Sequence, residues 1–379
     1  MATALGRNAK NAPRRPSNPP LRTQPTHTML LPRSSTTHRF AGSLLLLACI
    51  LTTSLPAADN DDSSGTLGLY HENDMFAGTD RYYTSGVKLS WSSPNLERFS
   101  DSPYASPFLP LFDLLPYINE TEYQKNLVFA IGQNIYTPDD TESVGLVGGD
   151  RPYAGWLYVG LGVVWKNERV RNSLVLDIGV VGSWSYAQES QRRVHDVRGF
   201  DNPNGWDNQL HNELGVMLAY ERTWRFPHIT RRSGFDWEFL PHAGGAVGNV
   251  KTYANLGAEL RFGLNLPDDF GTGVIGPAST TSTPVDGGMG AERSWFPLGM
   301  YVFTRMDGRA VGRNVFLDGN TFGSSHSVGH KLFVADLSVG FAFNYKNTKL
   351  AYAFVYRTKE FDNQYEPQVF GSVSLNWTF

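Results

Sequence analysis

Hydrophobic and polar residues alternate along most of the chain after residue 65, with the two-residue period that is typical of β-strands. Between Leu157 and Trp165, for example, every odd-numbered position is aliphatic or Trp, while Gly fills two of the even-numbered positions. The pattern predicts a series of strands, each long enough to cross a membrane when tilted. The predicted strands are Thr66–Asp74, Tyr82–Ser92, Asn126–Asn134, Ala154–Lys166, Asn172–Gly182, Gln209–Arg225, Asp236–Gly248, Thr252–Leu264, Pro297–Gly308, Lys331–Tyr345, Thr348–Lys359 and Gln368–Phe379.

The first 58 residues have the pattern of a secretory signal peptide. They hold seven basic and no acidic residues, then the apolar run Leu44–Leu51, then small residues at Ala57 and Ala58. The run is shorter than the roughly 20 residues of a spanning helix. Met29 is a candidate start, because a signal beginning there would have an ordinary length. Lipid attachment at Cys49 is the alternative, disfavoured because the apolar run continues beyond it.

Alternation alone fits both a soluble β-sandwich and a membrane barrel, whose apolar face turns to lipid. Three features favour the barrel: the export signal, the even number of strands, and Val373–Phe379, an alternating strand with an aromatic end. That ending resembles the C-terminal insertion signal of outer-membrane proteins. We therefore predict an all-β fold for residues 59–379, a transmembrane antiparallel β-barrel of about twelve strands with long outer loops.

Charge and cysteine content narrow the function further. The full chain has 33 basic and 36 acidic residues, and removing the signal leaves 26 basic and 36 acidic, a net charge of −10. Such an acidic protein is a poor binder of nucleic acid. Cys49 is the only cysteine, so the mature chain would have no disulfide.

Ionisable and hydrogen-bonding residues gather in four groups near predicted strand ends, and at least the first three could share one rim. The groups are His71–Gly86; Gly132–Asp140 with Gly149–Trp156; Gln188–His195 with Asp201 and Gly205–Glu213; and Arg357–Phe361.

His195 is the candidate general base, because a neutral imidazole can take a proton from water near pH 7. An ordinary surface histidine is the alternative, and His211 is a competing candidate. Asp74 and Asp201 are candidate oxygen ligands for a hard cation such as Ca²⁺, although on spacing alone solvated loop carboxylates are the better explanation. No Gly-x-Ser-x-Gly motif supports a serine hydrolase, but Thr84 offers a hydroxyl.

Several short motifs, in order and spacing across nearly the whole mature chain, resemble the lipid A deacylase family of outer-membrane barrels. They are Asn73-Asp74, Asp80–Gly86, Gly132–Pro138, Asp150–Trp156, the Gln191-to-His195 spacing, Gly205–Leu210, Thr358–Phe361 and the terminal strand.

The resemblance implies a twelve-stranded, Ca²⁺-dependent barrel that removes the 3′-linked acyloxyacyl group of lipid A. It implies catalytic roles for Asn73, Asp74, Thr84 and His195. Asp201 matches an acidic position that is Glu in the best-known member. A loop lysine of that member corresponds to Ser143 here, a departure that bears on the substrate.

We therefore expect an outer-membrane esterase of a Gram-negative bacterium that hydrolyses an acyl ester of lipopolysaccharide with a His195-activated water and Ca²⁺. The metal would be held by Asp74 and Asp201. Its partners would be lipid A and the surrounding outer-membrane lipid, and the barrel would act as a monomer. A phospholipase and a non-enzymatic outer-membrane barrel are the alternatives.

Overall fold

The computed structural model describes the following residues: 65–78, 81–101, 118, 120–226, 234–276, 278, 284–285 and 298–379. The predicted signal peptide, residues 1–58, lies outside this range. None of the helices in the described residues is long and apolar enough to cross a membrane.

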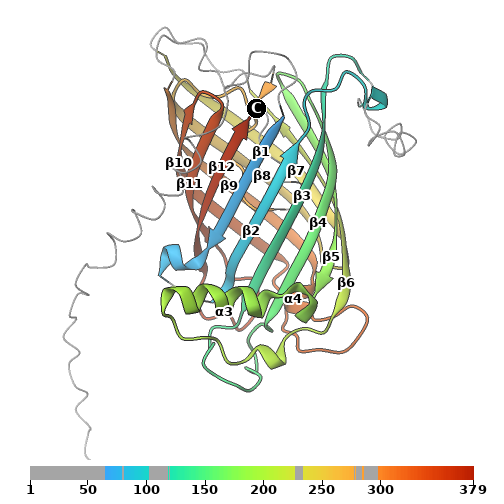
Figure 1. The fold of residues 1–379 in the computed structure, drawn as a ribbon, viewed down its shortest axis with the longest axis vertical. Coiled ribbons are helices and arrows are strands. Elements are labelled where there is room, and N and C mark those ends of the chain that lie inside the picture. Colours follow the sequence, from blue (N-terminus) through green and yellow to red (C-terminus); the bar gives the residue numbers. More distant parts are fainter. Residues whose placement is uncertain are drawn as a thin grey trace, which may run out of the picture. The chain divides into compact units, whose positions relative to one another are not determined.

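Within the described part of the chain, twelve strands form a closed antiparallel barrel, in which each strand pairs with its neighbours in sequence and β12 pairs with β1 (Figure 1). The strands are β1 (Thr66–Asn73), β2 (Tyr82–Ser92), β3 (Gln124–Thr137), β4 (Ala154–Lys166), β5 (Val170–Val181), β6 (Glu213–Trp224), β7 (Phe235–Gly248), β8 (Lys251–Leu264), β9 (Leu298–Asn314), β10 (Phe333–Tyr345), β11 (Thr348–Arg357) and β12 (Gln368–Thr378). The helices are η1 (Asp74–Ala77), η2 (Phe99–Asp101), η4 (Ser183–Ser185), α3 (Ala187–Arg198), η5 (Trp206–Asn208) and α4 (Val315–Asp318).

Each predicted strand is confirmed, and the alternation has the expected cause. On β2, the side chains of Val87 and Leu89 are 44% and 43% exposed on the outside, whereas Lys88 between them is buried inside. The largest shift of a strand end is at β9, which continues past Gly308 to Asn314. Trp165 is an exception on the apolar face of β4, because Phe99 and other residues of the β2–β3 connection cover it.

The long connections lie at both ends of the barrel, so the expectation that they gather at the outer end is only partly right. An even number of strands brings both termini to one end, and connections 93–123 and 265–297 lie at that same end. The opposite end, here called the rim, carries η1 and connections 138–153, 182–212, 315–332 and 358–367. All four groups of polar residues predicted from the sequence fall at the rim.

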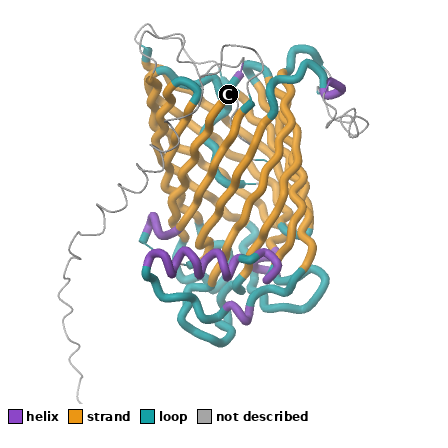
Figure 2. The backbone as a smooth tube through the Cα atoms, in the orientation of Figure 1, coloured by secondary structure: helices purple, strands orange, loops and turns teal. Residues whose placement is uncertain are grey.

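The β8–β9 connection folds back into the barrel from the terminal end (Figure 2). Its Asp269 is buried, with one carboxylate oxygen 2.5 Å from Arg261 Nη1 and the other 2.7 Å from Lys349 Nζ. Further along, the main-chain N–H of Ile275 donates to Glu72 of β1 over 2.7 Å. The connection thus occupies part of the lumen and ties β8, β11 and β1 together.

The Asp269 cluster generates a stability prediction. We expect Asp269→Ala to destabilise the barrel by about 3–5 kcal/mol, because Arg261 and Lys349 would stay buried without this carboxylate. Asp269→Ala/Lys349→Met should recover part of the loss by removing one of the two cations. Urea unfolding in lipid vesicles, followed by tryptophan fluorescence, measures both. Equal stability of Asp269→Ala and the wild type would contradict this account.

Candidate active site on the outer wall of the barrel

The first candidate residues lie where β1 ends and η1 begins. Asn73 caps η1, since the main-chain N–H of Met75 donates to its Oδ1 over 2.8 Å. The carboxylate of Asp74 is fully buried, and its Oδ2 accepts the main-chain N–H of Arg81 over 2.5 Å. Because Arg81 directly precedes β2, this bond closes the connection between the first two strands.

Thr84 occupies an irregular position in β2. Tyr83 pairs with Tyr136 and Ser85 pairs with Ile135, so Thr84 is an extra residue in this strand, as in a β-bulge. Its Oγ1 lies 2.8 Å from Oγ1 of Thr137, the last residue of β3. Bulges redirect side chains, and this one places a second hydroxyl beside Thr137 on the outer face of the wall.

Both candidates face away from the lumen. Alternate residues of a strand point to the same face. Asn73 lies six residues after the exposed Leu67 in β1, and Thr137 lies eight residues after the exposed Phe129 in β3, so both side chains point outwards. Asn73 pairs with Ser85, the residue after Thr84, so the ladder brings the two groups to one height. The first two strands therefore present their polar ends together.

Helix α3 covers this part of the outer wall. Figure 1 shows it lying across β1–β4 just above the rim loops. It begins over Gly155 of β4, where an added Cβ would collide with Ser185 and Ala187. It ends near β1, where the charge of Arg198 acts on His71. Its buried residues Ala187, Gln191 and His195 recur every four positions, so they share the face turned to the barrel.

His195 lies on the face of α3 that is turned to the barrel, and a main-chain carbonyl holds its buried ring. Its Nδ1 lies 2.7 Å from the carbonyl oxygen of Asp201. A carbonyl only accepts, so Nδ1 carries the proton and Nε2 is the acceptor nitrogen of the neutral ring. Gly199, with φ of 73°, ends the helix and turns the chain back, so that Asp201 can reach the imidazole.

Asp201 therefore meets His195 through its backbone, while its side chain is exposed. The competing candidate His211 lies elsewhere on the rim. Its main-chain N–H donates to Asn320 Oδ1 over 2.9 Å, and its carbonyl accepts from Asn320 Nδ2 over 2.8 Å. His211 thus links two rim connections, and its ring is exposed.

Gln191 is a site residue to which the sequence assigned no role. Its side chain is 4% exposed, and its Oε1 accepts the indole N–H of Trp206 over 3.0 Å. Since an indole N–H only donates, the amide atom that faces Trp206 is Oε1, and Nε2 points away from Trp206. Nε2 is buried and has no hydrogen-bond partner among the described residues. The only indication in the sequence is the spacing of one helical turn between Gln191 and His195.

The oxygen atoms at the site are of the chemical types that bind a hard cation. Asn73, Asp74 and Thr84 offer amide, carboxylate and hydroxyl oxygens, which are ligands that Ca²⁺ accepts. Within the described ranges, no three His, Cys, Asp or Glu side chains lie close enough to form a metal centre by themselves. A bound cation would therefore also need main-chain, water or substrate oxygens.

The loop that lacks the family lysine is acidic. Ser143, at the corresponding position, donates its hydroxyl to Asp140 over 2.5 Å. Hydrogen bonds from the Ser143 side chain and backbone lower the pKa of the Asp140 carboxyl. The loop's arginine, Arg151, is buried beside Glu360 and not available at the surface. A substrate phosphate would meet no loop lysine here.

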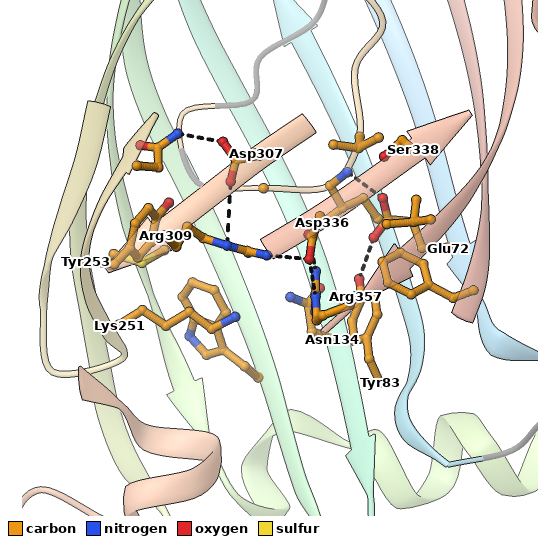
Figure 3. A pocket seen from close by; sticks show the side chains of 18 of the residues that line it. Glu72, Tyr83, Asn134, Lys251, Tyr253, Asp307, Arg309, Asp336, Ser338 and Arg357 are labelled. Carbon is orange, nitrogen blue, oxygen red and sulfur yellow. Dashed lines mark hydrogen bonds and ion pairs between the residues drawn. The ribbon is translucent and has the colours of Figure 1, made fainter. Parts of the chain in front are cut away.

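A second polar region, the lumen cavity, lies on the other face of the wall (Figure 3). Its volume is about 100 Å³, enough for a few water molecules. Glu72 and Tyr83, neighbours of Asn73 and Thr84 along the chain, line it. Its Arg309 and Arg357 both pair with Asp336, at 2.6 Å and 2.8 Å. The candidate catalytic residues and the cavity are therefore separate sites.

The sequence and the fold both match known proteins. A family model described as "Outer membrane protein LpxR" matches residues 44–379. LpxR from Salmonella typhimurium superposes with a TM-score of 0.65 at 22% identity, covering 83% of this chain and 100% of that chain.

Another solved structure aligns over a similar share of the chain. The β domain of the Bordetella autotransporter BrkA gives a TM-score of 0.40 at 9% identity, covering 84% of this chain and 99% of that one. A search of curated proteins returns no match. The family model spans most of the sequence, and this barrel of the Gram-negative outer membrane belongs to the outer membrane protein LpxR family.

Proposed function

We propose that this protein is a lipid A 3′-O-deacylase-like esterase, which hydrolyses an acyl ester of lipopolysaccharide with a water activated by His195. The observation that carries the proposal is the position of His195. Its side chain is buried between α3 and the outer wall, with Nδ1 bonded to the Asp201 carbonyl, which makes Nε2 the acceptor nitrogen of the neutral ring. A base on the lipid side of a barrel suits a lipid substrate.

The orientation of the barrel supports lipopolysaccharide over phospholipid. An exported chain reaches the outer membrane from the periplasm, so both termini would stay on that side and the rim would face the exterior. The site would then lie at the level of the outer leaflet, whose lipid is lipopolysaccharide in a Gram-negative bacterium. Family membership agrees with this substrate class.

The proposed mechanism uses side chains at the site in three roles. His195 Nε2 takes a proton from water as the water oxygen attacks the ester carbonyl carbon. Gln191 Nε2 donates a hydrogen bond to the carbonyl oxygen as negative charge develops there. The bond between the carbonyl carbon and the sugar oxygen then breaks, and the imidazolium gives its proton to the leaving sugar alkoxide. The products are a free fatty acid and a sugar hydroxyl.

Ca²⁺ would be held by the buried carboxylate of Asp74, with oxygen atoms of Thr84 and Asn73 nearby. Asp201 would be a weaker contributor, because its carboxylate is exposed. When bound, the cation supplies positive charge that polarises an ester carbonyl. Asp74 also fixes the entry to β2 through Arg81, so it has a structural role as well.

The first test removes the base. We expect His195→Ala to lower the rate of acyl release from lipopolysaccharide by about 10²–10⁴-fold, because the water loses its proton acceptor. Mass spectrometry of the lipid A measures the loss of the acyl chain. His211→Ala is the matched control and should keep wild-type activity. Release of fatty acid from phospholipid but not from lipid A by the wild type would replace the proposed function with a phospholipase.

A second test addresses the cation. Chelation should abolish acyl release and added Ca²⁺ should restore it. Asp74→Asn should raise the Ca²⁺ concentration required for half-maximal activity by more than about ten-fold, and Asp201→Asn should raise it less, because its side chain is exposed. Full activity of the wild type in chelator would refute the role of Ca²⁺ while leaving that of His195 intact.

A third test concerns the oxyanion. Gln191→Ala should lower kcat by about 10²–10³-fold with little change in KM, because its amide would donate mainly to the developing charge. Gln188→Ala, on the same helix but half-exposed, is the control. An unchanged kcat in Gln191→Ala would remove Gln191 from the mechanism and assign it to packing against Trp206.

A further inference from the structure

Helix α3 has exposed side chains that neither the barrel packing nor the proposed chemistry explains. Val197 is 88% exposed and Val194 is 45% exposed, although both are aliphatic. Arg192 and Arg193 are exposed on the same helix. Apolar side chains that are exposed next to one another, unlike single ones, indicate a surface that contacts a partner or a membrane.

The direction of the helix determines where these side chains point. The helix runs from β4 towards β1 with Ala187, Gln191 and His195 against the wall (Figure 1). A right-handed helix turns 100° per residue. Val194 and Val197 therefore occupy the flank towards the body of the barrel, and Arg192 occupies the opposite flank towards the rim loops. The helix is thus apolar on its membrane side and charged on the other, where Arg192 shares the surface with the exposed Glu189 and Asp196.

The height of the helix places that apolar flank near lipid. α3 packs on Ile135 of β3 through Ala187. Ile131, on the same outer face, is 42% exposed and belongs to the lipid-facing belt. Four residues of a strand span roughly 13 Å between Cα atoms, and the helix is about 10 Å thick, so only a few ångströms separate α3 from the belt.

The residues just before α3 fit the same setting. Trp184 and Tyr186 are 62% and 63% exposed. Trp and Tyr are enriched where a membrane meets water, because their rings are apolar at one end and polar at the other. An interfacial helix typically combines such rings with an apolar flank and basic residues.

We propose that the outer face of α3 is a lipid-binding surface. Val194 and Val197 enter the boundary between acyl chains and headgroups, and Arg192 and Arg193 bind phosphate groups of the anionic outer-leaflet lipid. Continuity with the lipid-facing belt and the charge of the arginines favour lipid over a protein partner. The surface holds α3, and with it His195, at the height of the headgroups; that consequence for catalysis rests on the proposed function.

The experiment measures membrane depth directly. The only cysteine is Cys49, so a chain beginning at residue 59 has none, and a single spin label can be placed at Val197→Cys. Phe322→Cys is the matched control, because Phe322 is 77% exposed at the same rim of the barrel. In phosphatidylcholine vesicles, the Val197 label should collide more with oxygen than with a water-soluble nickel chelate. The Phe322 label should show the reverse.

A second part of the experiment tests the arginines. Adding phosphatidylglycerol should lower the access of the nickel chelate to the Val197 label, and Arg192→Gln/Arg193→Gln should remove that change. A Val197 label as open to the nickel chelate as the Phe322 label in both vesicles would overturn the proposal, and a label insensitive to phosphatidylglycerol would overturn the role of the arginines. Resistance of the barrel to unfolding in cold SDS verifies that each variant is folded. No turnover is measured, so an inactive wild type would refute the proposed function alone.

Discussion

The lipid interior offers no hydrogen-bond partner to a peptide group, and this constraint shapes the whole molecule. A sheet in lipid has to close, because each open edge would leave its N–H and C=O groups unpaired. Here β1 meets β12 along its full length, from Thr66 opposite Thr378 to Asn73 opposite Gly371. Closure gives every strand an inner and an outer face, so the parity of a residue decides which of two environments it enters.

That division explains how two polar regions can lie so close and remain separate. Glu72 points into the lumen and Asn73 points out, although they are adjacent in sequence. Lipid cannot solvate polar groups on the outer face, so they need a cover, and α3 with η1 supplies it at the rim. The bulge at Thr84 locally breaks the parity rule and adds one more hydroxyl to the covered patch.

The sequence was sufficient to predict the barrel and its polar rim, because both follow from local patterns. Two-residue alternation identified the strands, and the antiparallel order of neighbouring strands places the four polar groups at one end. The motifs also identified the family correctly. The sequence could not predict the α3 cover or the entry of the β8–β9 connection into the lumen. Asp269 forms an ion pair with Lys349, which is eighty residues away in the sequence, and no local pattern predicts such a contact.

The same reasoning explains why the proposed site does not use the lumen. The inner polar groups pair with one another, as Arg309 and Arg357 do with Asp336, and the returning connection fills the space beneath them. A lipid acyl chain could enter that space only by leaving its membrane and displacing these pairs. In the proposed reaction on the outer wall, the acyl chain would stay in its own leaflet, and only the ester would have to reach His195. A barrel closed by its own charged interior thus leaves its lipid-facing wall as the natural place for chemistry on lipids.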